Sequence, residues 1–144
     1  MFTHMLIATD GSDVANKAID RGVALAKALN AKVTVVTDTK PFRGSLGEMD
    51  VTASADQYHK QAADWASKVL STAASAAKEA GIACDTVHVG GHYPAEGIVK
   101  AAEENGCDVI VIASHGRRGL QRLMLGSQAQ KVVTLSTVPV LVWR

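Results

Sequence analysis

Apolar and polar positions along the chain alternate between the period of a strand and that of a helix. Five short apolar runs, rich in β-branched residues, indicate strands. The predicted strands are Met5–Ala8, Val33–Thr37, Cys84–Val89, Val109–Ala113 and Val138–Trp143. Val109–Ala113 is apolar at every position, as expected of a parallel strand that helices cover on both faces.

Four helices are predicted between these strands, from apolar residues spaced at i and i+3 or i+4. They cover Ala15–Leu29, about Asp56–Ala80, Pro94 to about Asn105, and Ser127–Leu135. Ser12 or Asp13 can cap the start of the first helix, and Asn30 can end it. Gly81 stands where a glycine often ends a helix, and Pro94 suits a first helical position.

The longest predicted connection is the polar, glycine-containing stretch from Pro41 to about Ala55. Loops of that length are usually functional or mobile. The helix after it carries an apolar stripe that we expect to be core. Its positions are Tyr58, Ala62, Trp65, Val69, Ala73, Ala76 and Ala80.

The alternation of strands and helices predicts an α/β fold, a doubly wound, Rossmann-like domain over residues 1–144. We expect a five-stranded parallel sheet in the order 3-2-1-4-5, with helices on both faces and right-handed crossovers. In such sheets ligands bind beyond the carboxyl ends of the strands, where the strand order reverses. That rule selects Ala8–Ser12 and Ala113–Ser127 as the segments that form a site.

Composition excludes several classes of protein. The chain is 47% apolar and 20% charged, unlike a disordered chain. Its apolar runs are far shorter than the roughly 20 residues that span a bilayer, and the start resembles no signal peptide. We therefore expect a cytoplasmic protein without a membrane partner. Cys84 and Cys107 form no CxxC pair and are expected to be small buried hydrophobic residues.

The net charge of +1 conceals an uneven distribution. Residues 109–144 carry five basic and no acidic side chains, whereas residues 1–108 carry ten basic and fourteen acidic ones. A one-sided basic segment points to an anionic partner. A solvated basic face is the alternative reading. We do not expect nucleic-acid binding, because the segment offers no platform of aromatic side chains for stacking bases.

The basic segment contains a glycine-rich loop that leads from a buried strand into a helix. Gly116, Gly119 and Gly126 allow close approach of the backbone, and the helix begins at Ser127. Free N–H groups and the helix dipole make such a start an anion site. The combination suits a phosphate group. The alternative is that the glycines only form turns and Ser127 only caps a helix.

Other phosphate and hydrolase motifs are absent from the sequence. There is neither a GxxxxGK[ST] loop nor a GxGxxG fingerprint after the first strand. A hydrolase elbow centred on Ser114 would need a glycine where Ile112 stands. Nucleophilic catalysis by Ser114 is therefore not expected.

The chain resembles the universal stress protein family, in its small single-domain bacterial class. Ile7–Ser12 is similar to the family's first strand and turn, and Pro139–Val142 to its last strand. The family's nucleotide-binding pattern is G-x2-G-x9-G-[ST]. Gly116 and Gly126–Ser127 match it at the right spacing, and Ala113 replaces the first glycine.

The resemblance implies that an adenine nucleotide, ATP or AMP, binds in this crevice. Loop backbone and Ser127 would hold its phosphates, and Asp10 would lie near ribose and phosphate, directly or through a nucleotide-bound cation such as Mg²⁺. The base would pack near Ala8 and Ile112, with main-chain contacts at Asp38. The full predicted site is Ala8, Thr9, Asp10, Asp38, Ile112, Ala113, His115, Gly116, Arg117, Gly126, Ser127 and Gln128.

Three functions follow as hypotheses. The first is an adenine-nucleotide-binding regulatory protein of the stress response, non-catalytic or very slow. The second is a weak ATPase or nucleotidyl transferase, and the third a dimeric scaffold that binds no nucleotide. An apolar edge strand at Val138–Trp143 also predicts a homodimer by pairing with its symmetry mate, as is usual in the resembled family.

Overall fold

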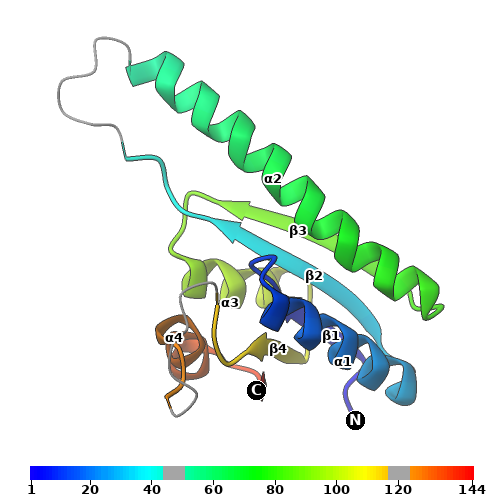
Figure 1. The fold of residues 1–144 in the computed structure, drawn as a ribbon. Helices are drawn as coiled ribbons and strands as arrows, with labels where there is room; N and C mark the ends of the chain where they lie inside the picture. Colours follow the sequence, from blue (N-terminus) through cyan, green and yellow to red (C-terminus); the bar gives the residue numbers. More distant parts are fainter. Residues whose placement is uncertain (44–50, 117–123) are drawn as a thin grey trace.

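A computed structural model describes residues 1–43, 51–116 and 124–144 of the chain, and side chains from residue 54 onward in the second of these ranges. Its strands form one five-stranded sheet in the order β3-β2-β1-β4-β5, with every neighbouring pair parallel (Figure 1). The predicted α/β class and strand order are thereby confirmed. The elements are β1 (His4–Ala8), α1 (Asp13–Leu29), β2 (Lys32–Thr39), α2 (Val51–Glu79), β3 (Cys84–Gly90), α3 (Pro94–Glu104), β4 (Val109–Ala113), α4 (Ser127–Leu135) and β5 (Val140–Trp143).

Helices cover both faces of the sheet, because the side chains of each central strand alternate between two apolar clusters. Met5 and Ile7 of β1 pack in the cluster under α1 and α2. Leu6 and Ala8 pack in the cluster under α3 and α4. This two-sided burial explains why β1 and β4 are buried along their whole length.

The sequence signals at the helix ends act as predicted. Ser12 caps α1, because its Oγ accepts from the Ala15 N–H at 3.2 Å. Asn30 ends α1 in the left-handed conformation, with φ of 55°. Gly81 follows α2 with φ of +76°, and Pro94 stands in the first turn of α3.

Helix α2 begins earlier than predicted. It starts at Val51, so residues 51–55 are helical and the predicted loop reaching Ala55 is too long. Residues 51–55 mix apolar and polar side chains, and no glycine or proline interrupts them. The first turns of α2 extend beyond the sheet in Figure 1, where no core exists to impose an apolar pattern.

The core-facing stripe of α2 is also displaced from the predicted one. Its buried residues are Ala66, Leu70, Ala73 and Ala77. Trp65 and the other predicted positions except Ala73 are only partly buried. Alanines lie on both lines at helical spacing, so the apolar pattern alone does not decide which line faces the sheet.

Strand β5 is shorter than predicted. It spans Val140–Trp143, and Val138 and Pro139 precede it. Pro139 still contributes to the sheet through its carbonyl, which accepts from the Ile110 N–H at 2.9 Å. Proline has no N–H to donate, which restricts it to the beginning or the edge of a strand.

Candidate functional site

The strand order reverses between β1 and β4, which lie side by side although about a hundred residues separate them in the chain. Their carboxyl ends therefore open at one edge of the sheet, where ligands of doubly wound folds bind. Ala8 and Thr9 are buried at the end of β1, and Ile112 and Ala113 at the end of β4. The structure thus brings together the two segments that the sequence selected.

The turn after β1 is held by its own side chains. The Thr9 N–H donates to the Val36 carbonyl at 2.9 Å, which ties the turn to β2. The Gly11 N–H donates to Thr9 Oγ1 at 3.1 Å, and the Ser12 N–H donates to Asp10 Oδ1 at 3.0 Å. This bonding orients Asp10 at the carboxyl edge of the sheet, partly exposed to solvent.

The loop after β4 is closed at its base. The Ser114 N–H donates to the Trp143 carbonyl at 2.6 Å, and the Gly126 N–H donates to the Ser114 carbonyl at 2.7 Å. Ser114 Oγ lies 3.0 Å from His115 Nδ1. Ser114 is therefore a buried link between the end of β4, the loop and β5. Sequence reasoning considered it only as a nucleophile.

Two glycines of this loop lie close to other site residues, Gly116 to Asp10 and Gly126 to Ser114. A Cβ added at Gly116 would lie 2.6 Å from Asp10 Oδ2, and one added at Gly126 would lie 2.8 Å from the Ser114 carbonyl oxygen. Both distances are shorter than van der Waals contact. At Gly126 the neighbour is backbone, so glycine is required there for the loop to close on Ser114, whereas at Gly116 the Asp10 carboxyl would have to move aside.

The start of α4 presents free donors. Gly126 is its N-cap residue and supplies no side-chain hydrogen bond. Ser127 and Gln128, the first two helical residues, are exposed. An uncapped helix start that carries no acidic residue in its first turn is suited to an anion.

Not every predicted site residue can be placed. Arg117 lies outside the described residues, as do Arg118, Gly119 and Arg122. Ala113, by contrast, is a regular strand residue paired with Trp143. Its replacement of the family's glycine imposes no backbone strain, since Asn30 is the one non-glycine residue with positive φ in the described part of the chain.

Asp38 is unusual in a way that the sequence did not predict. The expected contact there was through the main chain, but its side chain is the exceptional feature. Both carboxyl oxygens are buried and have no hydrogen-bond partner among the described residues. Burial raises the pKa of this carboxyl to about 7, because it disfavours the charged form. The available signal was an acidic residue within a β-branched strand.

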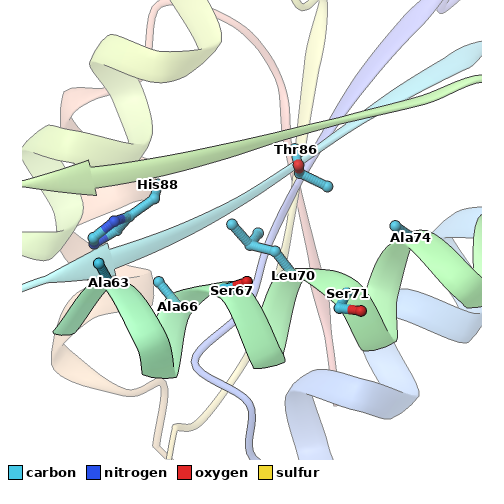
Figure 2. Close-up of a pocket in the computed structure, with 8 residues that line it drawn as sticks. All are labelled: Ala63, Ala66, Ser67, Leu70, Ser71, Ala74, Thr86 and His88. Carbon is cyan, nitrogen blue, oxygen red and sulfur yellow. The ribbon is translucent and has the colours of Figure 1, made fainter. Parts of the chain in front are cut away.

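Two hollows lie elsewhere on the surface. One, of about 430 Å³, lies between α2 and β3, and none of the predicted site residues lines it; Figure 2 shows Thr86 and His88 of β3 facing small residues of α2 there. The other, of about 560 Å³, lies at the end of β5 and is lined by Leu125, Val142, Trp143 and Arg144. It borders the loop beside Gly126.

Two structural properties limit the possible chemistry. Within the described ranges, no group of three or more His, Cys, Asp or Glu side chains could hold a metal ion. No helix in the described part of the chain is long and apolar enough to cross a membrane.

Comparison with known proteins gives consistent results. The model of the universal stress protein family matches residues 1–144. The chain is 36% identical over 151 residues to universal stress protein YxiE of Bacillus subtilis, and the match covers 100% of both chains.

Solved structures agree with these sequence matches. The structure of MJ0577, a protein of Methanocaldococcus jannaschii, superposes with a TM-score of 0.83 at 27% identity, covering 99% of this chain and 95% of that one. A universal stress protein solved in complex with cAMP superposes with a TM-score of 0.69 at 26% identity, covering 99% and 97%.

Proposed function

The chain belongs to the universal stress protein family, and on that premise we propose that it is an adenine-nucleotide-binding regulatory protein. The observation that carries the proposal is the closed loop after β4. Gly116 in it lies against Asp10, and Gly126 lies so close to the Ser114 carbonyl that any larger residue would clash. The relative solved with cAMP supports an adenine nucleotide as the ligand.

Each part of the nucleotide has candidate partners in this arrangement. Backbone N–H groups at Gly116 and at the start of α4 would hold the phosphates, with Ser127 adding a hydroxyl and Gln128 lying beside it. Asp10 would face the ribose and the phosphates, directly or through Mg²⁺ bound to them. ATP and AMP share the adenosine and the first phosphate, so both are proposed ligands.

The base would lie toward β2. Ala8 and Ile112 offer apolar side chains at the ends of β1 and β4. Beyond Ala8, β2 continues to Thr39, so its last residues offer main-chain groups near Asp38 to a base lying on β1. Thr9 is buried between these strands, where its carbonyl accepts from Thr37 Oγ1 at 2.7 Å.

We propose that the protein acts by binding and through a partner, with ATP hydrolysis at most very slow. His115, the predicted site residue best suited to proton transfer, has its Nδ1 hydrogen-bonded to Ser114.

We also propose a homodimer through β5. This strand pairs with β4 alone in the sheet, and Leu141 is exposed on it. Pairing with a second copy would cover this apolar edge.

The experiment that tests nucleotide binding is calorimetric titration of the wild type and Gly126→Val with ATP and AMP. We expect Gly126→Val to abolish binding, because its side chain would clash with the Ser114 carbonyl and open the loop. Ser127→Ala should cost less, about 0.5–1.5 kcal/mol for a neutral hydrogen bond.

The matched control is Gly90→Val, at the exposed end of β3. A Cβ there would lie 3.5 Å from Thr39 Oγ1, an ordinary contact. Thermal melts should show that both variants fold. A folded Gly126→Val protein that binds ATP like the wild type would overturn the proposed site, and a wild type that binds neither nucleotide would overturn the proposed function.

A further inference from the structure

Asp38 lies at the carboxyl end of β2, on the face of the sheet that α3 and α4 cover. Val36, two residues earlier, packs in the cluster of that face together with Ala8 and Ile112. Side chains two residues apart on a strand share a face. Because Ala8 pairs with Val36 in the sheet register, Asp38 extends beyond the end of β1. Its side chain is therefore on the same side of the sheet as the apolar residues proposed to hold the base.

The fold makes room for this carboxyl. A Cβ added at Gly97 in α3 would overlap Asp38 Oδ2, and it would also lie 3.0 Å from Val89 Cγ1. Gly97 is buried and sits in the first turns of a helix, where glycine is unfavourable on its own account. The glycine therefore accommodates Asp38.

The carboxyl lacks the hydrogen bonds that a buried polar group normally makes. Neither oxygen has a partner within the described residues. Gly97, against which the carboxyl lies, is not titratable, and the raised pKa has burial as its cause. His88 on β3 bonds to Thr39 Oγ1 on the opposite face, and Glu96 on α3 is exposed. A buried acceptor without a donor is costly, and folded proteins rarely keep one.

We propose that the Asp38 carboxylate determines base specificity by accepting a hydrogen bond from the exocyclic amino group of adenine. The inference rests on the proposed function. Adenine carries a donor at its 6-position, whereas hypoxanthine and guanine carry an acceptor oxygen there. An acceptor facing a carboxylate is repelled, so this contact selects adenine over 6-oxopurines. In the structure the carboxyl lies against Gly97, and the contact requires it to turn toward the ends of β1 and β4.

The test compares ATP with ITP, which differ at the 6-position of the base, on the full chain by calorimetric titration. The wild type should prefer ATP by about tenfold or more, the scale of one charge-assisted hydrogen bond. Asp38→Asn should reduce that preference to about threefold or less, because its amide can donate to the oxo group. The matched control is Glu96→Gln, which removes an exposed carboxylate from the same region and should keep the wild-type preference.

A second readout separates a direct contact from a structural effect. The ionised carboxylate accepts from the amino group more strongly than the protonated acid, so the affinity ratio of wild type to Asp38→Asn for ATP should rise by up to about tenfold from pH 6 to pH 8. Titration of the phosphates cancels in this ratio. Asp38→Val, which replaces the carboxyl with a buried apolar group, should also lose the preference and provides a second variant should Asp38→Asn fold poorly.

Different outcomes would contradict the role of Asp38 and the proposed nucleotide binding. An unchanged ATP preference in folded Asp38→Asn and Asp38→Val proteins, or a pH-independent affinity ratio, overturns the role of Asp38 and leaves nucleotide binding intact. A wild type that binds neither ATP nor ITP overturns the proposed function itself.

Discussion

Two polar residues on the same face of β2, both with buried side-chain oxygens, differ in how those oxygens are satisfied. Thr34, at the amino-terminal half of the strand, is completely buried, and its Oγ1 lies 2.8 Å from His4 Nε2. Asp38, four residues later, has two buried oxygens with no described partner. At the amino-terminal end of β2, Thr34 and His4 satisfy each other, whereas the Asp38 oxygens at the carboxyl end have no partner among the described residues. Ligands of doubly wound sheets bind at the carboxyl end, where such a group can serve one.

The pKa values of His4 and Asp38 are shifted in opposite directions by the same cause, which is burial. Burial lowers the pKa of His4, with Lys32 adding to the effect, whereas burial raises the pKa of Asp38 to about 7. In both cases the charged form is disfavoured. Because the folded chain binds fewer protons at His4 than the unfolded chain, the free energy of unfolding should fall as the pH drops below about 6.5. Because the folded chain binds more protons at Asp38, the free energy of unfolding should also fall as the pH rises.

The largest effect expected is on the pH dependence of stability in Asp38→Asn. The folded chain binds more protons at Asp38 than the unfolded chain between pH 3.8 and about 7, so wild-type stability is lost as pH rises through that window. From pH 5 to pH 8 the variant should gain about 2–3 kcal/mol relative to the wild type. Urea unfolding at a series of pH values measures this, and parallel curves for the two proteins would show that Asp38 is not buried in solution.

Thr34→Val should act on the fold and not on the ligand. It leaves His4 Nε2 buried without its partner, which should cost about 1–3 kcal/mol of unfolding free energy. ATP affinity and the preference for ATP over ITP should not change, because Thr34 lies away from the carboxyl end of the sheet. Thr34→Ser, which keeps the hydroxyl, should restore most of the stability. A changed nucleotide preference in Thr34→Val would remove the distinction between the two ends of β2.

The smallest effect expected comes from Gly97→Ala, and it should depend on Asp38. In the wild type the new methyl overlaps the carboxyl and should cost about 1–2 kcal/mol through overpacking. In an Asp38→Ala background the carboxyl is gone, and the better helix propensity of alanine should make the same substitution neutral or stabilising. Chemical unfolding of the four proteins forms a double-mutant cycle. Equal effects in both backgrounds would show that Gly97 does not accommodate Asp38.

Much of the fold was predictable, because it depends on patterns that are local in the sequence. The switch from a period of two to a period of 3.6 located every strand and helix, and the ends at Ser12, Asn30 and Gly81 follow from the chemistry of single residues. The start of α2 was wrong because the region beyond the sheet has no core to impose periodicity. Its stripe was wrong because alanine and tryptophan are both apolar, and only packing decides which of them faces the sheet.

The candidate site divides in the same way. By itself the sequence predicted the candidate ligand end of the sheet and fixed the spacing of Gly116, Gly126 and Ser127, since the alternation of elements and motif spacing are properties of the linear chain. The tertiary structure alone decided that Gly97 makes room for Asp38, that Thr34 meets His4, and that one of these polar groups is satisfied and the other is not. The physical reason is that burial and hydrogen bonding depend on atoms from strands and helices that lie 30 to 59 residues apart in the chain.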